Sequence, residues 1–330
     1  FEPEMINPDS DLFRAHPDWL LALDGYQQPT GRYQYVLDLQ KPQVFDYLLE
    51  RLDTMLGRYD IAYVKWDMNR EVVQPGHDGY AALDGQTKAL YDLFDELRQR
   101  HPKVEFESCA SGGGRIDYEI LKRTHRFWTS DNNDALERQQ IQRGMSYFFP
   151  PEVMGSHIGG RHCHSTRRTH SIGFRGLTAL FGHMGVELDP VKESAEEQAG
   201  FTHYIALHKQ LRPLLHSGKV VRIDHHDPAL QINGVIAQDQ SSAVFLFSQL
   251  AMPTYTLSGN ARLAGLDPTK HYRLTVLDQP ASMRTGGVMK KLPLWLDEEM
   301  TLSGAWLAKA GTALPVLDPE SALLIKLDAV

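Results

Sequence analysis

The sequence has 330 residues, 42% of them hydrophobic and 23% charged, which is the composition of an ordinary globular protein. No apolar run approaches the roughly 18 residues that a membrane helix needs, which argues against a membrane partner. The formal net charge of −8 at pH 7 argues against nucleic acid, because a polyanion binds to clustered positive charge. We therefore expect a protein that acts on a small molecule.

Length and cysteine content narrow the class further. At roughly 100–200 residues per domain, the length predicts two domains. Cys109 and Cys163 cannot form a disulfide framework, and neither has the spacing of a zinc site, which favours a reducing, cytoplasmic location. Residues 1–5 have the pattern of a strand's end, so we expect the chain to be a fragment.

The first two thirds of the chain alternate between short apolar runs and amphipathic segments. Strands are predicted at residues 33–38, 61–67, 104–109, 127–129, 152–156 and 178–182. Helices are predicted at residues 42–56, 85–100, 116–124, 134–146 and 193–215. This alternation predicts parallel β/α units, with six strands and the end of another.

Beyond Gly218 the pattern changes to short alternating runs separated by Asn-Gly, Ser-Gly and Gly-Gly turns. Residues 220–223, 243–247 and 272–276 are typical of an antiparallel β-sandwich. We therefore predict an α/β domain over residues 1–217 and an all-β domain over residues 218–330.

The segment at residues 63–70 places a cation and a carboxylate at the end of a predicted strand. The two-residue period of a strand puts Lys65 and Asp67 on one face and directs Trp66 into the opposite packing. A nearby lysine favours an ionised carboxylate, so Asp67 is a candidate nucleophile or base. A buried ion pair that only ends the strand is the alternative, and this segment alone does not decide between them.

A second carboxylate follows the aromatic strand at residues 127–129. Glycosidic cleavage requires two carboxyl groups, one to attack and one to protonate the leaving oxygen. Asp131 is the candidate acid, because the aromatic strand end would desolvate it and raise its pKa. Asp134 competes for the role, although its place before a predicted helix favours an N-cap.

Two further features have ordinary explanations as well as functional ones. Residues 112–114 are three glycines after a strand, which suit a tight turn and do not match a nucleotide-binding loop. Three histidines, His162, His164 and His170, resemble a metal site, but three arginines in the same segment would repel a divalent cation.

Three segments in this order resemble the α-galactosidases of glycoside hydrolase family 36: residues 65–70, 109–115 and 130–134. Residues 1–5, 32–38 and 263–268 also resemble the family, so the similarity spans the whole chain. It implies that Asp67 is the nucleophile and Asp131 the acid/base of a retaining α-galactosidase that needs no metal or other cofactor. It further implies that Arg32 and Lys65 bind sugar hydroxyls, and that Cys109 and Gly112 line the pocket beside the 2-hydroxyl.

The resemblance also implies a fold. We expect an N-terminally truncated (β/α)8 TIM barrel, from the end of strand 2 through helix 8, followed by an all-β antiparallel sandwich. In the family the missing part includes an N-terminal β-domain and an aspartate pair that holds O4 and O6. Asn133 stands where Thr is common in the family, and Ala110 where Ser or Gly is common.

The substrate implied by the resemblance is a small α-galactoside such as melibiose or raffinose, and the full-length protein is expected to be a homo-oligomer. An α-N-acetylgalactosaminidase or a raffinose-synthase-like galactosyltransferase would use the same two carboxylates. A non-catalytic carbohydrate-binding barrel is the alternative from a different class.

Overall fold

The computed structural model describes residues 1–285 and 291–330. By its internal contacts the chain divides into two compact units, Phe1–Asp131 and Asn132–Val330. Each unit is described by itself below.

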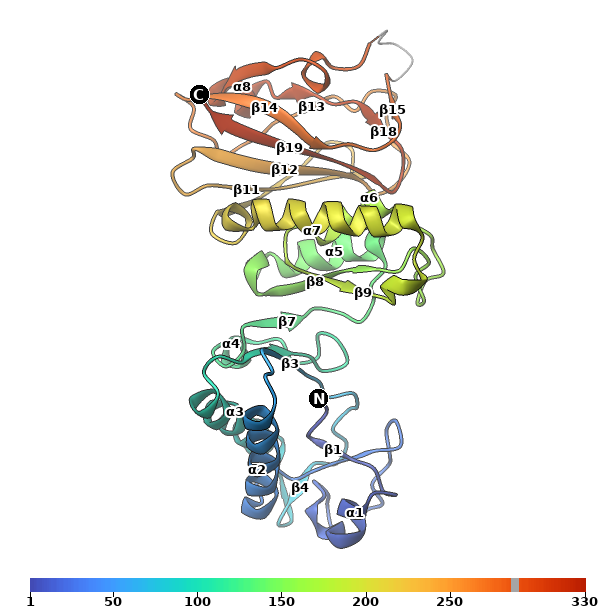
Figure 1. Ribbon diagram of the computed structural model, residues 1–330, viewed down its shortest axis with the longest axis vertical. Helices are drawn as coiled ribbons and strands as arrows, with labels where there is room; N and C mark the ends of the chain where they lie inside the picture. Colours follow the sequence, from blue (N-terminus) through green and yellow to red (C-terminus); the bar gives the residue numbers. More distant parts are fainter. Residues whose placement is uncertain (286–290) are drawn as a thin grey trace. The chain divides into compact units, whose positions relative to one another are not determined.

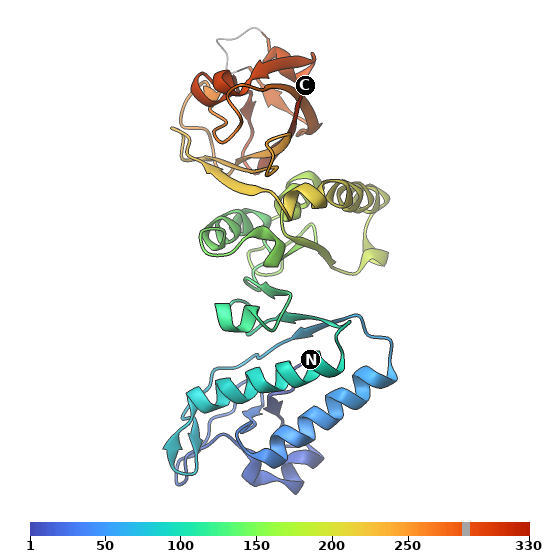
Figure 2. The same ribbon diagram turned by 90° about the vertical axis from the view of Figure 1, so that its left-hand side faces the viewer.

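The first unit is built on three parallel strands, in the order β3 (Tyr63–Trp66), β6 (Glu105–Ser108) and β7 (Arg126–Trp128). Helices α2 (Pro42–Arg58) and α3 (Leu83–Arg100) pack against each other and run side by side (Figure 2). Proline at the first turn of α2 suits the start of a helix, because that position needs no backbone N–H donor. These strands and helices agree with the predicted β/α units.

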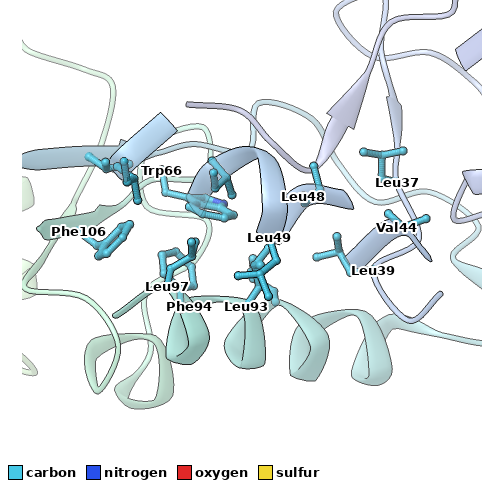
Figure 3. Packing of buried hydrophobic residues seen from close by; sticks show 14 of the residues in the cluster. Leu37, Leu39, Val44, Leu48, Leu49, Trp66, Leu93, Phe94, Leu97 and Phe106 are labelled. Atoms are coloured by element: carbon cyan, nitrogen blue, oxygen red, sulfur yellow. The ribbon is translucent and has the colours of Figure 1, made fainter. Parts of the chain in front are cut away.

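The core of the first unit contains the side chain of Trp66, the last residue of β3. Trp66 is fully buried, and its ring lies 4.5 Å from that of Phe94 on α3, which in turn meets Phe106 of β6 at 5.6 Å (Figure 3). The indole Nε1 of Trp66 donates a 2.9 Å hydrogen bond to Glu4. The predicted burial of Trp66 is confirmed, and the neighbouring residues 65 and 67 are only partly buried.

The shorter elements of the first unit depart from the prediction. The strand expected at 33–38 is reduced to β2 (Tyr35–Val36), which pairs antiparallel with β1 (Met5–Ile6) and not with a parallel neighbour. The helix expected at 116–124 is only α4 (Tyr118–Leu121). The other short elements are α1 (Asp11–Ala15), η1 (Pro17–Trp19), β4 (Gly76–His77) and β5 (Tyr80–Ala81).

The second unit begins with further β/α elements (Figure 1). They are α5 (Ala135–Met145), η2 (Pro151–Val153), β8 (Met154–Gly159), α6 (Ile172–Ala179), β9 (His183–Glu187), η3 (Pro190–Lys192) and α7 (Ala195–Leu215). Strands β8 and β9 pair in parallel. The strand predicted at 178–182 is wrong, because residues 178 and 179 end α6 and the strand starts at His183. A short apolar run does not distinguish a buried strand from a buried helix.

The C-terminal part of the second unit is an antiparallel six-stranded sheet. Its strand order is β10 (Lys219–Ile223), β11 (Leu230–Ile236), β12 (Ser242–Gln249), β19 (Ser321–Ala329), β14 (His271–Asp278) and β16 (Met300–Ser303). Two small sheets accompany it, β13 (Asn260–Ala261) with β17 (Thr312–Ala313) and β15 (Met283–Arg284) with β18 (Val316–Leu317). The helical elements here are η4 (Leu294–Leu296) and α8 (Gly304–Lys309).

Two findings concern membrane spans and the cysteines. None of the helices in the described residues is both long and apolar enough to span a membrane. Cys109 and Cys163 are both free and buried.

Candidate active site

Asp67 directly follows strand β3, and hydrogen bonds hold its carboxylate. The backbone N–H of Met68 donates at 2.9 Å, the side-chain amide of Asn69 at 2.6 Å and the backbone N–H of Ser111 at 3.4 Å. The thiol of Cys109 is a further donor. Burial alone would raise the pKa of Asp67, but these hydrogen bonds outweigh it and keep the pKa below its usual value. Asp67 is therefore ionised at neutral pH, as a nucleophile must be.

Lys65 does not act on Asp67 in the way the sequence suggested. Its Nζ lies 3.7 Å from Oε1 of the buried Glu107 and 4.5 Å from the ring centroid of Trp128. The expectation that this lysine is what favours the ionised carboxylate is therefore wrong, because hydrogen bonds lower the pKa of Asp67. The side chain of Lys65 is one third exposed.

Cys109 follows strand β6 and is 1% exposed. Burial, together with the hydrogen bond to Asp67, raises the pKa of its thiol to about 12. The thiol therefore remains protonated and can donate its hydrogen to the carboxylate. The sequence alone would describe Cys109 as a small buried apolar residue, which leaves out this donor role.

The turn that follows Cys109 contacts both predicted catalytic residues. Gly112 has φ +79°, and a Cβ atom at this position would lie 2.8 Å from the backbone N of Asp131 and 2.9 Å from Cα of Ser130. Only glycine combines this backbone conformation with so close an approach. The backbone of Ser111 donates to Asp67, so one turn joins the nucleophile candidate to the acid candidate.

Asp131 and Asp134 occupy different environments. Trp128 donates from Nε1 to Oδ1 of Asp131 at 3.0 Å, and Asp131 itself is exposed, so the desolvation expected from the aromatic strand end is not found. Asp134 is fully buried and accepts hydrogen bonds from the backbone N–H groups of Leu136 (2.9 Å) and Glu137 (3.1 Å). The N-cap role predicted for Asp134 is confirmed.

Arg32 is connected to Asp67 through two intermediate side chains. Its Nη1 lies 3.5 Å from Oε1 of Glu2, which accepts a hydrogen bond from the same Asn69 amide that donates to Asp67. The arginine side chain is 61% exposed, so sequence reasoning alone could only describe it as a surface residue. The structure therefore brings Arg32 into the network around the nucleophile candidate.

Sequence reasoning missed Arg70, which supports the turn that carries Arg32. Its guanidinium donates to the carbonyl oxygens of Pro29 (3.1 Å), Gln34 (2.5 Å) and Glu71 (2.9 Å), and the residue is buried. The available signal was its place at the end of the 65–70 segment. Because its partners are backbone carbonyls, no pattern of side chains could have identified them.

The histidine-rich loop does not bring its three histidines together. His162 contacts the hydroxyl of Thr169 at 3.2 Å, and His164 is exposed. His170 is buried, with Nε2 3.3 Å from Oδ1 of Asp134.

The arrangement as a whole suits displacement at an acetal carbon. An ionised carboxylate and a second carboxylate come from the ends of two strands and are attached to one turn. A pair of carboxyl groups from different strand ends is what glycoside hydrolysis requires.

Comparison with known proteins agrees with this chemistry. The family model described as melibiase matches residues 1–218, and that of the glycosyl hydrolase family 36 C-terminal domain matches residues 229–327. The chain belongs to glycoside hydrolase family 36. This confirms the resemblance found in the sequence.

Individual relatives extend over the whole chain. It is 62% identical over 330 residues to an α-galactosidase of Escherichia coli, covering 99% of this chain and 47% of that protein. α-Galactosidase 2 of Hypocrea jecorina is 38% identical over 282 residues, covering 83% of this chain and 37% of that protein. The chain thus spans at most about half the length of these relatives.

Solved structures show the same fold. A variant of the family 36 α-galactosidase AgaA from Geobacillus stearothermophilus, in complex with raffinose, matches with a TM-score of 0.88 at 31% identity, covering 100% of this chain and 44% of that one. The α-galactosidase of Lactobacillus brevis matches with a TM-score of 0.87 at 32% identity, covering 100% of this chain and 44% of that one. The predicted fold class, a TIM-barrel catalytic domain followed by an antiparallel β-domain, is confirmed by these matches.

Proposed function

We propose that the protein containing this chain is a retaining α-galactosidase that hydrolyses terminal α-linked galactose in melibiose- or raffinose-type sugars. The observation that carries the proposal is the ionised carboxylate of Asp67, held beside the turn that packs against Asp131. The names of the relatives, and the raffinose in the AgaA complex, support the choice of substrate.

In the proposed first step Asp67 attacks the anomeric carbon, and the bond to the leaving oxygen breaks as Asp131 protonates that oxygen. In the second step Asp131 takes a proton from water, whose oxygen attacks the same carbon and releases Asp67. Each step inverts the configuration, so the product keeps the α-configuration. Hydrogen bonds that favour the anion of Asp67 also make it a stable leaving group in the second step.

We also propose that Arg32, Lys65, Cys109 and Gly112 bind the sugar. Exposure of Arg32 and partial exposure of Lys65 support contacts with hydroxyl groups. The absence of a side chain at Gly112 allows a ligand to approach the backbone closely. Cys109 fixes the carboxylate and borders the same turn.

The domain division, the cellular location and the oligomeric state are further proposals. The division into domains at residues 1–217 and 218–330 is supported by the two family models, which cover residues 1–218 and 229–327. A cytoplasmic location is supported by the two free cysteines. The predicted homo-oligomer would be tested by light scattering coupled to gel filtration of the full-length protein.

Stereochemistry of the first product tests the proposed reaction. Proton NMR of the full-length enzyme acting on nitrophenyl α-galactoside should show α-galactose first, followed by mutarotation. If β-galactose forms first, the retaining mechanism is rejected. Parallel assays with the N-acetyl analogue, and with sucrose as acceptor, separate the galactosidase from the two related activities.

A further inference from the structure

Three charged side chains form a row across the parallel sheet of the first unit. The strand register pairs Lys65 of β3 with Glu107 of β6, and Glu107 with Arg126 of β7. Nζ of Lys65 lies 3.7 Å from Oε1 of Glu107, and Nε of Arg126 lies 3.1 Å from Oε2 of the same carboxylate. One carboxylate therefore interacts with a cation from each neighbouring strand.

The carboxylate of Glu107 does not need Lys65 to compensate for its burial. Glu107 is 1% exposed, and a buried carboxylate is costly unless it is paired and hydrogen-bonded. Arg126 supplies both a charge and a hydrogen bond at 3.1 Å. Burial and the proximity of Glu107 raise the pKa of the Tyr63 phenol, so this hydroxyl stays protonated and is a second donor to the carboxylate. Arg126 and Tyr63 thus already satisfy Glu107 from the side of its neighbouring strands.

The ammonium of Lys65 is held by interactions that leave its hydrogen-bond donors unused. The 3.7 Å separation from Glu107 exceeds the roughly 2.7–3.2 Å of an N–H···O hydrogen bond, so the attraction is mainly Coulombic. Nζ also lies 4.5 Å from the ring centroid of Trp128, which is a cation–π contact. Among the described residues Nζ donates no hydrogen bond, and the side chain is one third exposed. The N–H groups of the ammonium are therefore available to a ligand.

We propose that Glu107 is a positioning residue for Lys65, whose ammonium donates to a hydroxyl group of the substrate sugar. The inference rests on the proposed function, which gives Lys65 its sugar-binding role. A free lysine side chain loses conformational entropy when it binds a ligand. Glu107 and Trp128 restrict the ammonium before the sugar arrives, so that less entropy is lost on binding. A salt bridge at hydrogen-bond distance would instead occupy a donor that the sugar needs.

This role predicts that the effect of Glu107 depends on the presence of Lys65. If Glu107 acts through Lys65, removal of its charge weakens sugar binding only while the lysine is there. A merely structural defect lowers the active fraction of the enzyme, and so lowers kcat/KM by the same factor whichever residue occupies position 65. A double-mutant cycle on the two positions separates these cases.

The test uses Lys65→Met, Glu107→Gln and the double variant in the full-length enzyme, with raffinose as substrate. Glutamine keeps the volume of glutamate and still accepts a hydrogen bond from Arg126. We expect Glu107→Gln to raise KM at least about tenfold and to change kcat by less than about threefold. In the Lys65→Met background the same substitution should change kcat/KM by less than about twofold.

Glu105→Gln is the matched control. Glu105 lies on the same strand and pairs with Arg126 at 2.8 Å, but the register places Tyr63 and not Lys65 opposite it. Its substitution therefore removes a partner of Arg126 without removing the carboxylate beside Lys65. Glu105→Gln should keep KM within about twofold of the parent.

The outcomes distinguish the positioning role from the role of Lys65 itself. If Lys65→Met raises KM but Glu107→Gln leaves KM unchanged, or lowers kcat/KM equally in both backgrounds, only the positioning role is rejected. If Lys65→Met leaves KM unchanged, Lys65 does not bind the sugar, and both that proposed role and this inference are rejected. Should circular dichroism show that Glu107→Gln is unfolded, Glu107→Asp replaces it in the cycle, because aspartate keeps the charge opposite Arg126 but withdraws the carboxylate by one methylene group.

Discussion

Gly112→Ala tests whether the turn at residues 109–112 sets the position of Asp131. A Cβ at residue 112 would lie 2.8 Å from the backbone N of Asp131, so the two must separate by about 0.6 Å to reach ordinary contact at 3.4 Å. A misplacement of about 1 Å costs roughly a hundredfold in rate, so this shift should lower kcat/KM at least about tenfold. The left-handed backbone adds about 1–2 kcal/mol of lost stability.

Gly25→Ala separates these two effects. Gly25 has the same φ of +79°, but a Cβ added there would meet nothing within 4 Å, so its substitution carries only the backbone cost. Urea denaturation should show a loss of unfolding free energy in both variants, whereas raffinose hydrolysis should fall only in Gly112→Ala. If Gly112→Ala keeps kcat/KM within threefold of the parent, the turn does not position Asp131 and the reasoning is refuted.

Three other substitutions test the proposed nucleophile, the turn that carries Arg32, and the core. Asp67→Asn should abolish hydrolysis, and azide should partly restore turnover to give β-galactosyl azide, seen by NMR; the α-azide would show that the roles are reversed. Arg70→Lys loses charge-assisted hydrogen bonds worth about 1.5–3 kcal/mol each. KM should therefore rise at least tenfold, with a smaller change in kcat. An unchanged KM would contradict the role of Arg70 in supporting the turn that carries Arg32. Phe94→Ala should lower the unfolding free energy by about 3–5 kcal/mol because Phe94 is fully buried, whereas the exposed Tyr118→Ala should change it by less than about 0.5 kcal/mol in urea denaturation.

The fold was predictable where a segment was long and strongly periodic. Helices α2, α3 and α7 lie close to their predicted ranges, because each has an apolar face repeated over several turns. The error at residues 178–182 arose where the apolar run was short and buried on all sides, so that no periodicity remained to be read. The antiparallel pairing of β2 with β1 depends on a contact distant in sequence, which no local pattern encodes.

For the candidate active site, the sequence could indicate the functional residues but not the hydrogen bonds and contacts that position them. Asp134 was correctly predicted as an N-cap, because the capping signal lies within three residues of it. The partners of Asp67 include Ser111, which is 44 residues away and donates from its backbone. A backbone donor carries no residue type, so composition and spacing cannot reveal it. The same holds for Gly112, whose necessity becomes visible only through its contact with the backbone of Asp131.

The state of Asp67 illustrates how a prediction can reach the correct charge through the wrong cause, and the pH profile distinguishes the two. If Cys109 lowers the pKa of Asp67, Cys109→Val removes the donor at similar volume, the pKa rises, and the acidic limb of kcat/KM moves to higher pH. Lys65→Met should leave the acidic limb in place, because the amine of Lys65 lies beside Glu107. Glu107 would still have its other cationic partner, Arg126, at 3.1 Å. The same substitution should raise KM, because Lys65 is proposed to bind the sugar. Were the acidic limb to move in Lys65→Met and stay fixed in Cys109→Val, the lysine rather than the thiol would govern the ionisation of the nucleophile.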